Sequence, residues 1–312
     1  MAARRKFRFG AQVYWAPSAT AWTEKARKVA DLGYSTLLMP DHFDQTLGPL
    51  VSLTAAALAA PGLRIGTLVL DNDFRHPVEL AKELATLDLM TEGRLEFGLG
   101  AGWMLSDYEQ SGIAYDPPQT RIDRFQEGLS ILKGLFGAGP YSFAGKHYTI
   151  TNLEGQPKPV QKPHPPIMIG TGGKRMLSIA AREASIINIT FSMRRGVWDP
   201  AASATGTAEA TAKKIRWLRE FAGERFDEIE LSAPVFVAKV TEQQRDAAER
   251  IAPRYGLTAD QVLRSPHFLI GSIGWIVEEL QRRREEYGFS YLIFGGETHE
   301  ALGPVVARLV GA

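Results

Sequence analysis

The sequence predicts a single (β/α)8 TIM barrel, and three observations lead to that fold class. Eight short apolar runs recur along the 312-residue chain, segments of helical periodicity separate most of them, and polar or glycine-rich motifs follow several of the runs. Short, nearly continuous apolar runs are typical of parallel strands that are covered on both faces. Eight strand–helix units favour a closed barrel over an open doubly wound sheet.

The predicted strands are the apolar runs, and each is short enough for a barrel strand. They are Phe9–Trp15, Ser35–Met39, Arg64–Leu70, Arg94–Leu99, Pro166–Gly170, Ala184–Ile189, Glu230–Val237 and Tyr291–Phe294.

The predicted helices lie between the strands. One of them opens with Pro77 and stops before Gly93, which is the asymmetry expected of a helix with proline in its first turn. The full set is Ala21–Leu32, Pro77–Met90, Arg121–Phe136, Lys174–Arg182, Thr207–Phe221, Ile273–Tyr287 and His299–Leu309.

Two segments interrupt the alternation. Residues 137–165 are rich in glycine, proline, aromatic residues and histidine, and residues 190–206 are mostly small or polar. We expect both to be loop insertions in one domain that covers residues 1–312. Loops that follow barrel strands carry the functional groups of such proteins.

Composition excludes several classes of function. Lysine plus arginine number 36 and aspartate plus glutamate 35, and no basic stripe predicts a nucleic-acid partner. No apolar run is long enough to span a membrane, and no apolar stretch follows the basic start, so a cytoplasmic protein is expected. The chain has no cysteine, which excludes disulfides, thiolate metal sites and cysteine nucleophiles.

The motif Pro40-Asp41-His42-Phe43 directly follows the second predicted strand. A histidine at the carboxyl end of a barrel strand lies where active sites form, and imidazole transfers protons near neutral pH. The alternative is a structural one, in which His42 caps a helix or satisfies a buried group.

Two glycine-rich motifs also end strands. In Gly98-Leu99-Gly100-Ala101-Gly102-Trp103 the alternating glycines would let the backbone approach a flat ligand, unless they only relieve crowding. The segment Ile167–Gly173 places glycines before a helix, and such a turn exposes N–H groups that bind phosphate.

A metal site is the competing interpretation of Asp41, His42, Asp71 and His76. The chain has no His-x-His pair at the first strand and no His-Glu-x-x-His motif, so we predict no metal. It also lacks the Gly-x-Ser-x-Gly elbow of serine hydrolases.

In this order, the motifs resemble the luciferase-like monooxygenase superfamily, and the resemblance covers nearly the whole chain. Its most specific part is FRHPVELAKELATLDLMTEGRLEFGLGAGW, residues Phe74–Trp103, and the later PPIMIGTGG supports it. Within the superfamily, the chain looks more like the actinobacterial branch that uses the deazaflavin coenzyme F420 than like bacterial luciferase.

The resemblance implies roles for individual residues. His42 would be the catalytic residue beside the reacting ring, and Leu68-Val69 would form a non-prolyl cis peptide that backs that ring. The residues implied to bind the cofactor are Asp41, Leu68, Val69, Asp71, Ala101, Gly102, Trp103, Ser106, Thr171, Gly172 and Gly173.

One departure from the resemblance changes the expected chemistry. The F420-dependent sugar-phosphate dehydrogenases have a glutamate proton donor where this chain has Trp103, and an indole is no such donor. Arg194 and Arg195 are a weak substitute for the basic cluster that binds a substrate phosphate. Tryptophan would instead pack on the ring or against the substrate.

The sequence therefore predicts an F420-dependent oxidoreductase that transfers a hydride between the deazaflavin and a small organic substrate. Tyr14 is expected to face the same pocket as His42 and Asp71. The alternatives are an FMN-dependent monooxygenase and a non-catalytic flavin-binding protein. The resemblance also leads us to expect a homodimer.

Overall fold

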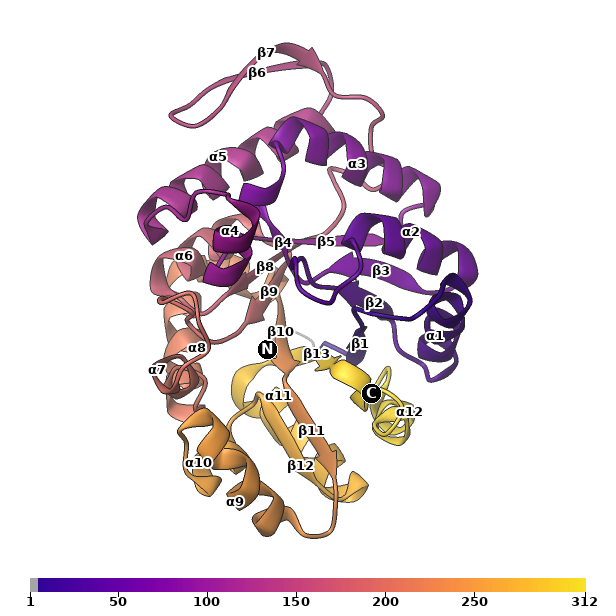
Figure 1. Ribbon diagram of the computed structural model, residues 1–312, viewed down its shortest axis with the longest axis vertical. Helices are drawn as coiled ribbons and strands as arrows, with labels where there is room; N and C mark the ends of the chain where they lie inside the picture. Colours follow the sequence, from indigo (N-terminus) through magenta and orange to yellow (C-terminus); the bar gives the residue numbers. More distant parts are fainter. Residues whose placement is uncertain (1–4) are drawn as a thin grey trace.

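The computed structural model describes residues 5–312 and confirms the predicted barrel (Figure 1). Eight parallel strands run in the order β3-β2-β1-β13-β10-β9-β8-β5, and β3 also pairs with β5, which closes the ring. The short strand β4 continues from β3 and pairs with β5. Helices surround the strands on the outside.

The barrel strands lie close to their predicted positions. They are β1 (Arg8–Gln12), β2 (Thr36–Met39), β3 (Arg64–Thr67), β4 (Leu70–Asp71), β5 (Leu95–Gly100), β8 (Ile167–Thr171), β9 (Ile186–Ile189), β10 (Glu230–Val235) and β13 (Phe289–Gly295).

Most helices of the outer layer begin within three residues of their predicted starts. Ser18 caps the first of them by accepting a hydrogen bond from the N–H of Ala21, and Trp22, Ala26 and Val29 on its inner face are buried. The set is α1 (Ala19–Asp31), α2 (Pro49–Ala59), α3 (Pro77–Met90), α5 (Pro118–Phe136), α6 (Lys174–Glu183), α8 (Ala208–Ala222), α11 (Ile273–Tyr287) and α12 (Gly303–Leu309).

Helix α2 was not predicted, and its composition explains why. Its sequence PLVSLTAAALA has almost no polar face, so the periodic alternation that identifies a surface helix is missing. At the other end of the chain, the predicted helix from His299 begins later, at Gly303.

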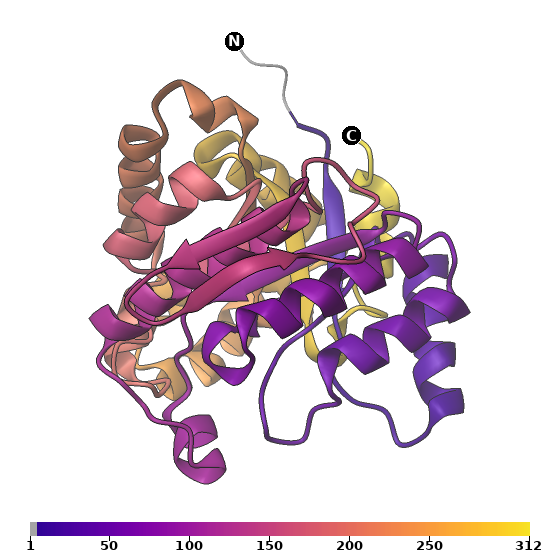
Figure 2. The ribbon, with the colours of Figure 1, turned by 90° about the horizontal axis from the view of Figure 1, so that it is seen from above.

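The predicted insertions contain structure of their own. Residues 137–165 include the antiparallel hairpin of β6 (Pro140–Ala144) and β7 (Thr149–Glu154), which lies across the outside of the helical layer (Figure 2). Residues 190–206 include the short helix α7 (Pro200–Ala204). Helix α4 (Leu105–Ser111) lies after β5.

A third excursion, between β10 and α11, was missed. It consists of β11 (Val237–Val240), α9 (Gln244–Tyr255), α10 (Ala259–Arg264) and β12 (Phe268–Gly271), and β11 pairs with β12 in a separate two-stranded sheet. Its buried alanines and Phe268 form a small core with Phe191, so this excursion supports the loop after β9.

The amino-terminal end of the barrel holds a cluster of charged side chains. Arg8 donates to the carboxylates of Glu96 at 2.7 Å and Glu230 at 2.8 Å, and Arg64 donates to Glu96 at 2.7 Å. The guanidinium carbon of Arg8 also lies 3.5 Å from the centre of the Tyr291 ring. Because Glu96 is buried, its charge depends on these arginines for compensation.

Candidate active site

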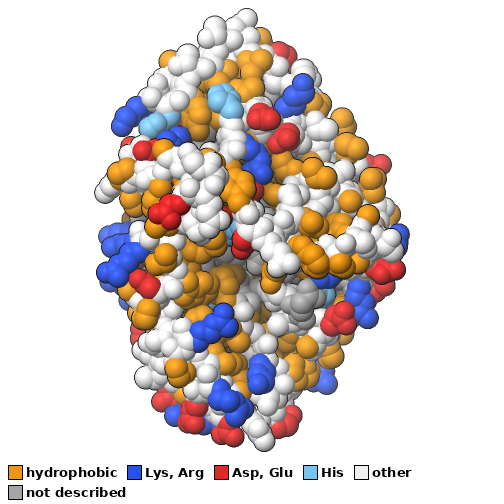
Figure 3. Space-filling view, in the orientation of Figure 1, with side chains coloured by type: hydrophobic (Ala, Val, Ile, Leu, Met, Phe, Trp, Pro, Cys, Tyr) orange, Lys and Arg blue, Asp and Glu red, His pale blue; other side chains and the backbone are white. Residues whose placement is uncertain are grey.

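A cleft of about 640 Å³ lies at the carboxyl ends of the barrel strands. Residues that follow β2, β3, β5, β8, β9 and β10 line it, so it has the position of the active site in barrel enzymes. The space-filling view shows this face hollowed near its centre, with hydrophobic side chains around the hollow (Figure 3).

His42 is paired with an aspartate that the sequence did not single out. Its Nδ1 lies 2.7 Å from Oδ2 of Asp107, and Oδ1 of Asp107 accepts the N–H of Phe43 at 3.1 Å. The imidazole also meets the Trp103 ring edge-to-face at 5.7 Å. Asp107 therefore fixes the ring and its tautomer, and Nε2 is the nitrogen left for a ligand.

The Asp41 carboxylate is already occupied by hydrogen bonds from other residues of the protein. Its carboxylate accepts two hydrogen bonds from Arg75, 2.5 and 3.0 Å long, and the N–H of Asp71 at 3.0 Å. This two-pronged contact keeps a buried carboxylate charged and joins the loop after β2 to β4.

The Leu68-Val69 peptide bond is cis, as the resemblance implied. The side chain of Val69 packs against two glycines of β5: a Cβ added to Gly98 or Gly100 would lie 2.8 Å from a methyl group of Val69. The alternating glycines therefore make room for a side chain of the protein. The expectation that they admit a flat ligand is not needed to explain them.

Gly102 has a similar explanation. It has a φ of +70°, and a Cβ there would lie 1.8 Å from the Tyr108 hydroxyl and 2.4 Å from Oδ2 of Asp71. A glycine is required because the backbone crosses directly over these two groups.

Asp71 lines the cleft and is buried beside a second acidic residue. The Tyr108 hydroxyl lies 2.8 Å from Oδ2 of Asp71 and 3.1 Å from Oδ2 of Asp73, and Arg124 donates to both oxygens of Asp73 at 2.7 Å. Burial raises the pKa of Asp71 to about 7, and the nearby charges of Asp73 and Asp41 act in the same direction.

The turn Thr171–Gly173 leads into α6, whose first turn no side chain caps. The exposed N–H groups of such a turn attract anions. Lys174, Arg175 and Arg194 also line this part of the cleft. The site can therefore hold a negatively charged tail.

Arg121, from the first turn of α5, lies at the same end of the cleft. It is buried, and within residues 5–312 its Nε and one terminal nitrogen have no hydrogen-bond partner. Its guanidinium carbon lies 4.1 Å from the centre of the Tyr115 ring, which supports it from one side.

Aromatic side chains form the opposite wall, after β9 and β10. Phe191 contacts Trp198 at 4.8 Å and Phe236 at 5.1 Å between ring centres, and the three line the cleft. Behind them His267 packs on Phe191 at 4.7 Å, and its Nδ1 lies 2.9 Å from the carbonyl oxygen of Pro234. Burial lowers the pKa of His267 to about 3, so the ring is neutral.

Lys214 of α8 holds both ends of the loop that carries Trp198. Its buried Nζ donates to the carbonyl oxygens of Thr190 at 2.6 Å and Thr205 at 2.7 Å. Burial lowers the pKa of Lys214 to about 7.

The structure brings most of the predicted site residues together. Those that line the cleft are Asp41, His42, Leu68, Val69, Asp71, Ala101, Gly102, Trp103, Thr171, Gly172 and Gly173. Ser106 is exposed on α4 and Tyr14 is 40% exposed, and neither is among the lining residues. Their assignment to the pocket therefore lacks support from the geometry.

Several lining residues carried no signal in the sequence. Asp107, Arg121 and Phe236 reach the cleft from α4, α5 and the segment after β10. The Asp107 carboxylate lies 65 residues from its histidine partner, so no spacing rule connects the two.

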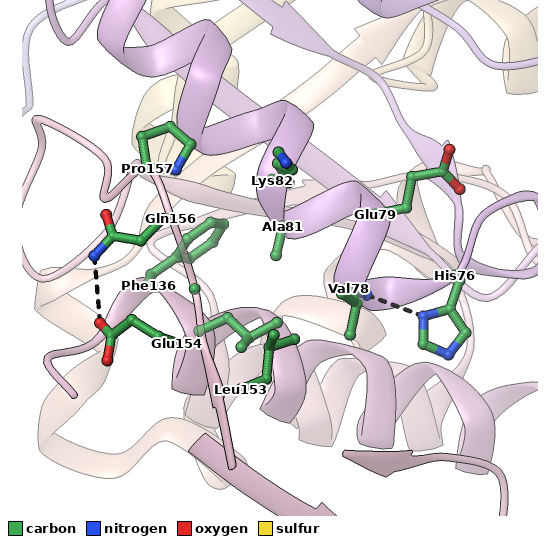
Figure 4. Close-up of a pocket in the computed structure, with 12 residues that line it drawn as sticks. His76, Val78, Glu79, Ala81, Lys82, Phe136, Leu153, Glu154, Gln156 and Pro157 are labelled. Carbon is green, nitrogen blue, oxygen red and sulfur yellow. Dashed lines mark hydrogen bonds between the residues drawn. The ribbon is translucent and has the colours of Figure 1, made fainter. Parts of the chain in front are cut away.

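A second cavity, of about 450 Å³, lies on the flank of the barrel between α3 and the segment Leu153–Pro157 (Figure 4). His76 lies at its edge, where its Nδ1 accepts the N–H of Val78 at 3.3 Å and so caps α3. His76 is absent from the lining of the cleft, which removes it from the metal site considered for Asp41, His42 and Asp71.

Among residues 5–312, no three histidine or carboxylate side chains are arranged to hold a metal ion. None of the helices within the same range combines the length and apolar character needed to cross a membrane.

Comparison with known proteins identifies a family. The family model described as luciferase-like monooxygenase matches residues 6–288. The F420-dependent glucose-6-phosphate dehydrogenase of Amycolatopsis mediterranei is 26% identical over 167 residues, 51% of this chain and 50% of that protein. The FMNH2-dependent dimethylsulfone monooxygenase of Pseudomonas putida is 31% identical over 133 residues, 42% of this chain and 36% of that protein.

The fold comparison agrees with the family match. The F420-dependent tetrahydromethanopterin reductase of Methanopyrus kandleri superimposes with a TM-score of 0.76 at 17% identity, over 98% of this chain and 99% of that one. Sequence matches to uncharacterised mycobacterial relatives span 60% of the length of those proteins.

Proposed function

The chain belongs to the luciferase-like monooxygenase family, and we propose that it is an F420-dependent oxidoreductase acting on a small, largely apolar organic substrate. The observation that carries the proposal is the cleft itself, which is lined both by the His42–Asp107 pair and by a turn suited to a negatively charged cofactor tail. F420, when bound, supplies hydride transfer, and the protein supplies binding, orientation and proton management.

The residues present fit such a cofactor. The turn Thr171–Gly173 and the side chains of Lys174 and Arg194 would bind its anionic tail. Val69 would support the ring. Arg121, two of whose buried nitrogens have no hydrogen-bond partner within the described residues, would also bind an oxygen atom of the ligand.

His42 is the proposed catalytic residue. Because Asp107 binds Nδ1, His42 can use Nε2 to donate or accept a proton at the bound ligand. The aromatic wall of Phe191, Trp198 and Phe236 would exclude water and bind an apolar substrate.

An FMN-dependent monooxygenase is the second candidate. Trp103 favours it, because it stands where the F420-dependent sugar-phosphate dehydrogenases have their proton donor, and the match to an FMNH2-dependent relative is consistent with it. A deazaflavin reacts poorly with oxygen, so the identity of the cofactor decides between reduction and oxygenation.

Titration of the purified protein with F420 and with FMN, followed by fluorescence, tests the proposal. Saturable F420 binding supports it. Tight FMN binding without F420 binding overturns it in favour of the monooxygenase, and binding of neither refutes both.

The role of His42 has its own test. We expect His42→Ala to lower turnover by about 10²–10⁴-fold and to change the cofactor dissociation constant much less, because general acid–base catalysis contributes this much. Asp107→Asn should also lower turnover, because its amide has one acceptor oxygen for two N–H donors, and an NH2 group facing Nδ1 would reverse the tautomer of His42. Turnover that survives His42→Ala would favour a flavin-binding protein without a catalytic histidine.

The expected homodimer stays a prediction. The neighbouring helices α2 and α3 carry exposed apolar side chains, among them Val51 at 81% and Met90 at 55% exposure. Subunit contacts are typically made where such side chains form a contiguous patch. Sedimentation analysis of the purified chain measures the state directly.

A further inference from the structure

Two carboxylates, Asp71 in the wall of the cleft and Asp73 behind it in the chain, compete for one hydroxyl proton. Tyr108 Oη lies within hydrogen-bond distance of Oδ2 of Asp71, at 2.8 Å, and of Oδ2 of Asp73, at 3.1 Å. A phenol has a single proton, so it can donate fully to one of them only. If both carboxylates were ionised, the other contact would bring two oxygen lone pairs together.

Asp73 is the carboxylate that keeps its charge. Arg124 binds both of its oxygens, and the same arginine donates to Asp116 at 2.8 Å. A two-pronged guanidinium contact of this kind strongly favours the ionised carboxylate. The Tyr108 hydroxyl can therefore donate to Asp73 and accept a hydrogen bond from its other neighbour.

Asp71 has the opposite surroundings. It is 6% exposed, it forms no direct ion pair within the described residues, and its nearest charged neighbours include the carboxylates of Asp41 and Asp73. Its Oδ1 accepts the N–H of Asp73 at 2.9 Å, so Oδ2 is the oxygen available for a proton. Burial without a directly paired cation favours the neutral acid, in agreement with its raised pKa.

We propose that Asp71 is the acid of the cleft: a neutral carboxylic acid whose Oδ2–H donates to Tyr108 and is available to a bound ligand. In the transfer, the O–H bond of the carboxyl breaks and the proton forms a bond to a basic atom of the ligand. The remaining carboxylate then accepts a hydrogen bond from the Tyr108 hydroxyl, which keeps its proton. No oxidant or further reactant is needed.

This assignment deepens the proposed function and rests on it for the identity of the ligand. It supplies a proton donor in a chain that has Trp103 where the similar dehydrogenases have glutamate. The charged and titratable groups that face Asp71 or its partner Tyr108 come from four parts of the chain: Asp41 after β2, Asp73 and Arg75 after β4, Tyr108 on α4, and Arg121 and Arg124 on α5.

The experiment is a carbon-13 NMR titration of the cofactor-free protein labelled at its aspartate carboxyl carbons. We expect one resonance to titrate near pH 7, far above ordinary aspartates, and to be absent from Asp71→Asn. The matched control Asp31→Asn, at an exposed aspartate on α1, should leave that resonance unchanged.

Tyr108→Phe tests the direction of the hydrogen bond. If the hydroxyl accepts the proton of Asp71, its loss removes a partner of the neutral acid, and the pKa of Asp71 falls. A rise in that pKa would show that the hydroxyl donates to an ionised Asp71, and would overturn the proposal.

The proposal also fails if every aspartate resonance of the wild-type protein titrates below about pH 5, within the ordinary range. This measurement uses the wild-type protein alone, so it does not depend on whether a variant folds. Infrared detection of a neutral carboxyl band in the wild type checks it independently. Because the titration uses no cofactor, its failure leaves the proposed function standing. Conversely, a protein that binds neither F420 nor FMN would not contradict the protonation of Asp71.

Discussion

The two ends of the barrel carry similar charged residues and use them differently. At the amino-terminal end, Arg8 and Arg64 bind Glu96 and Glu230. At the carboxyl end Asp41 and Asp73 are likewise bound by arginines. His42, Asp71 and Arg121, by contrast, line the cleft and keep hydrogen-bonding capacity. The difference separates charged groups that hold the barrel from polar groups that are available to a ligand.

The largest predicted effect concerns the charge cluster around Arg8 at the amino-terminal end. We expect Arg8→Met to lower the free energy of unfolding by about 3–5 kcal/mol, because it leaves the buried Glu96 and the Glu230 carboxylate with less compensation. Urea denaturation measures the loss. Cofactor binding by the folded fraction should be unchanged.

The matched control is an exposed ion pair. Arg195 is 78% exposed at its side chain and pairs with Asp199, so Arg195→Ala should cost less than about 1 kcal/mol. If Arg8→Met weakened cofactor binding in the folded protein, the division between the two ends would be wrong.

The second prediction concerns His267, the buried histidine behind the aromatic wall at the carboxyl end. His267 is neutral in the folded protein because its pKa is lowered from 6.5 to about 3, whereas the unfolded chain binds a proton below pH 6.5. The free energy of unfolding should therefore decrease as the pH is lowered from about 6.5 to 3. At pH 5 this residue should have reduced it by about 2 kcal/mol.

His267→Asn should reduce that dependence, because the amide keeps a donor for the carbonyl oxygen of Pro234 and does not titrate. Urea denaturation of both proteins at pH 7 and pH 5 measures the difference. Parallel losses of stability in the two proteins would show that the buried imidazole is not responsible.

The smallest predicted effect concerns Ser106. The resemblance assigns it to the cofactor, but it is exposed on α4 and absent from the lining of the cleft. Ser106→Ala should therefore change cofactor affinity by no more than about twofold, as for a surface substitution that alters free energy by less than about 0.5 kcal/mol. A tenfold loss would mean that α4 moves towards the ligand when it binds.

Sequence alone predicted the barrel and one side of its cleft because both depend on local patterns. Apolar runs mark the strands, and the motifs around His42, Gly102 and Gly173 lie at strand ends, where chain order already determines their position. The cis peptide at Leu68-Val69 followed from resemblance and is present.

The remaining features depend on contacts between distant segments. Asp107 and Arg121 meet the cleft only after α4 and α5 have packed, and the aromatic wall combines residues after β9 with residues after β10. The excursion between β10 and α11 escaped prediction as well. The glycines were recognised, but the reason for them was not, because the contact with Val69 is visible only in three dimensions.

The contact of Lys214 with Thr190 and Thr205 has a consequence for how this protein can diversify. One side chain fixes both stems of the loop that carries Trp198. With the stems held, inserting or deleting residues between them costs only a slowly growing closure entropy. The loop can therefore change in length and composition with little disturbance to the barrel, so new substrate preferences can arise while the groups around His42 and Asp71 stay in place.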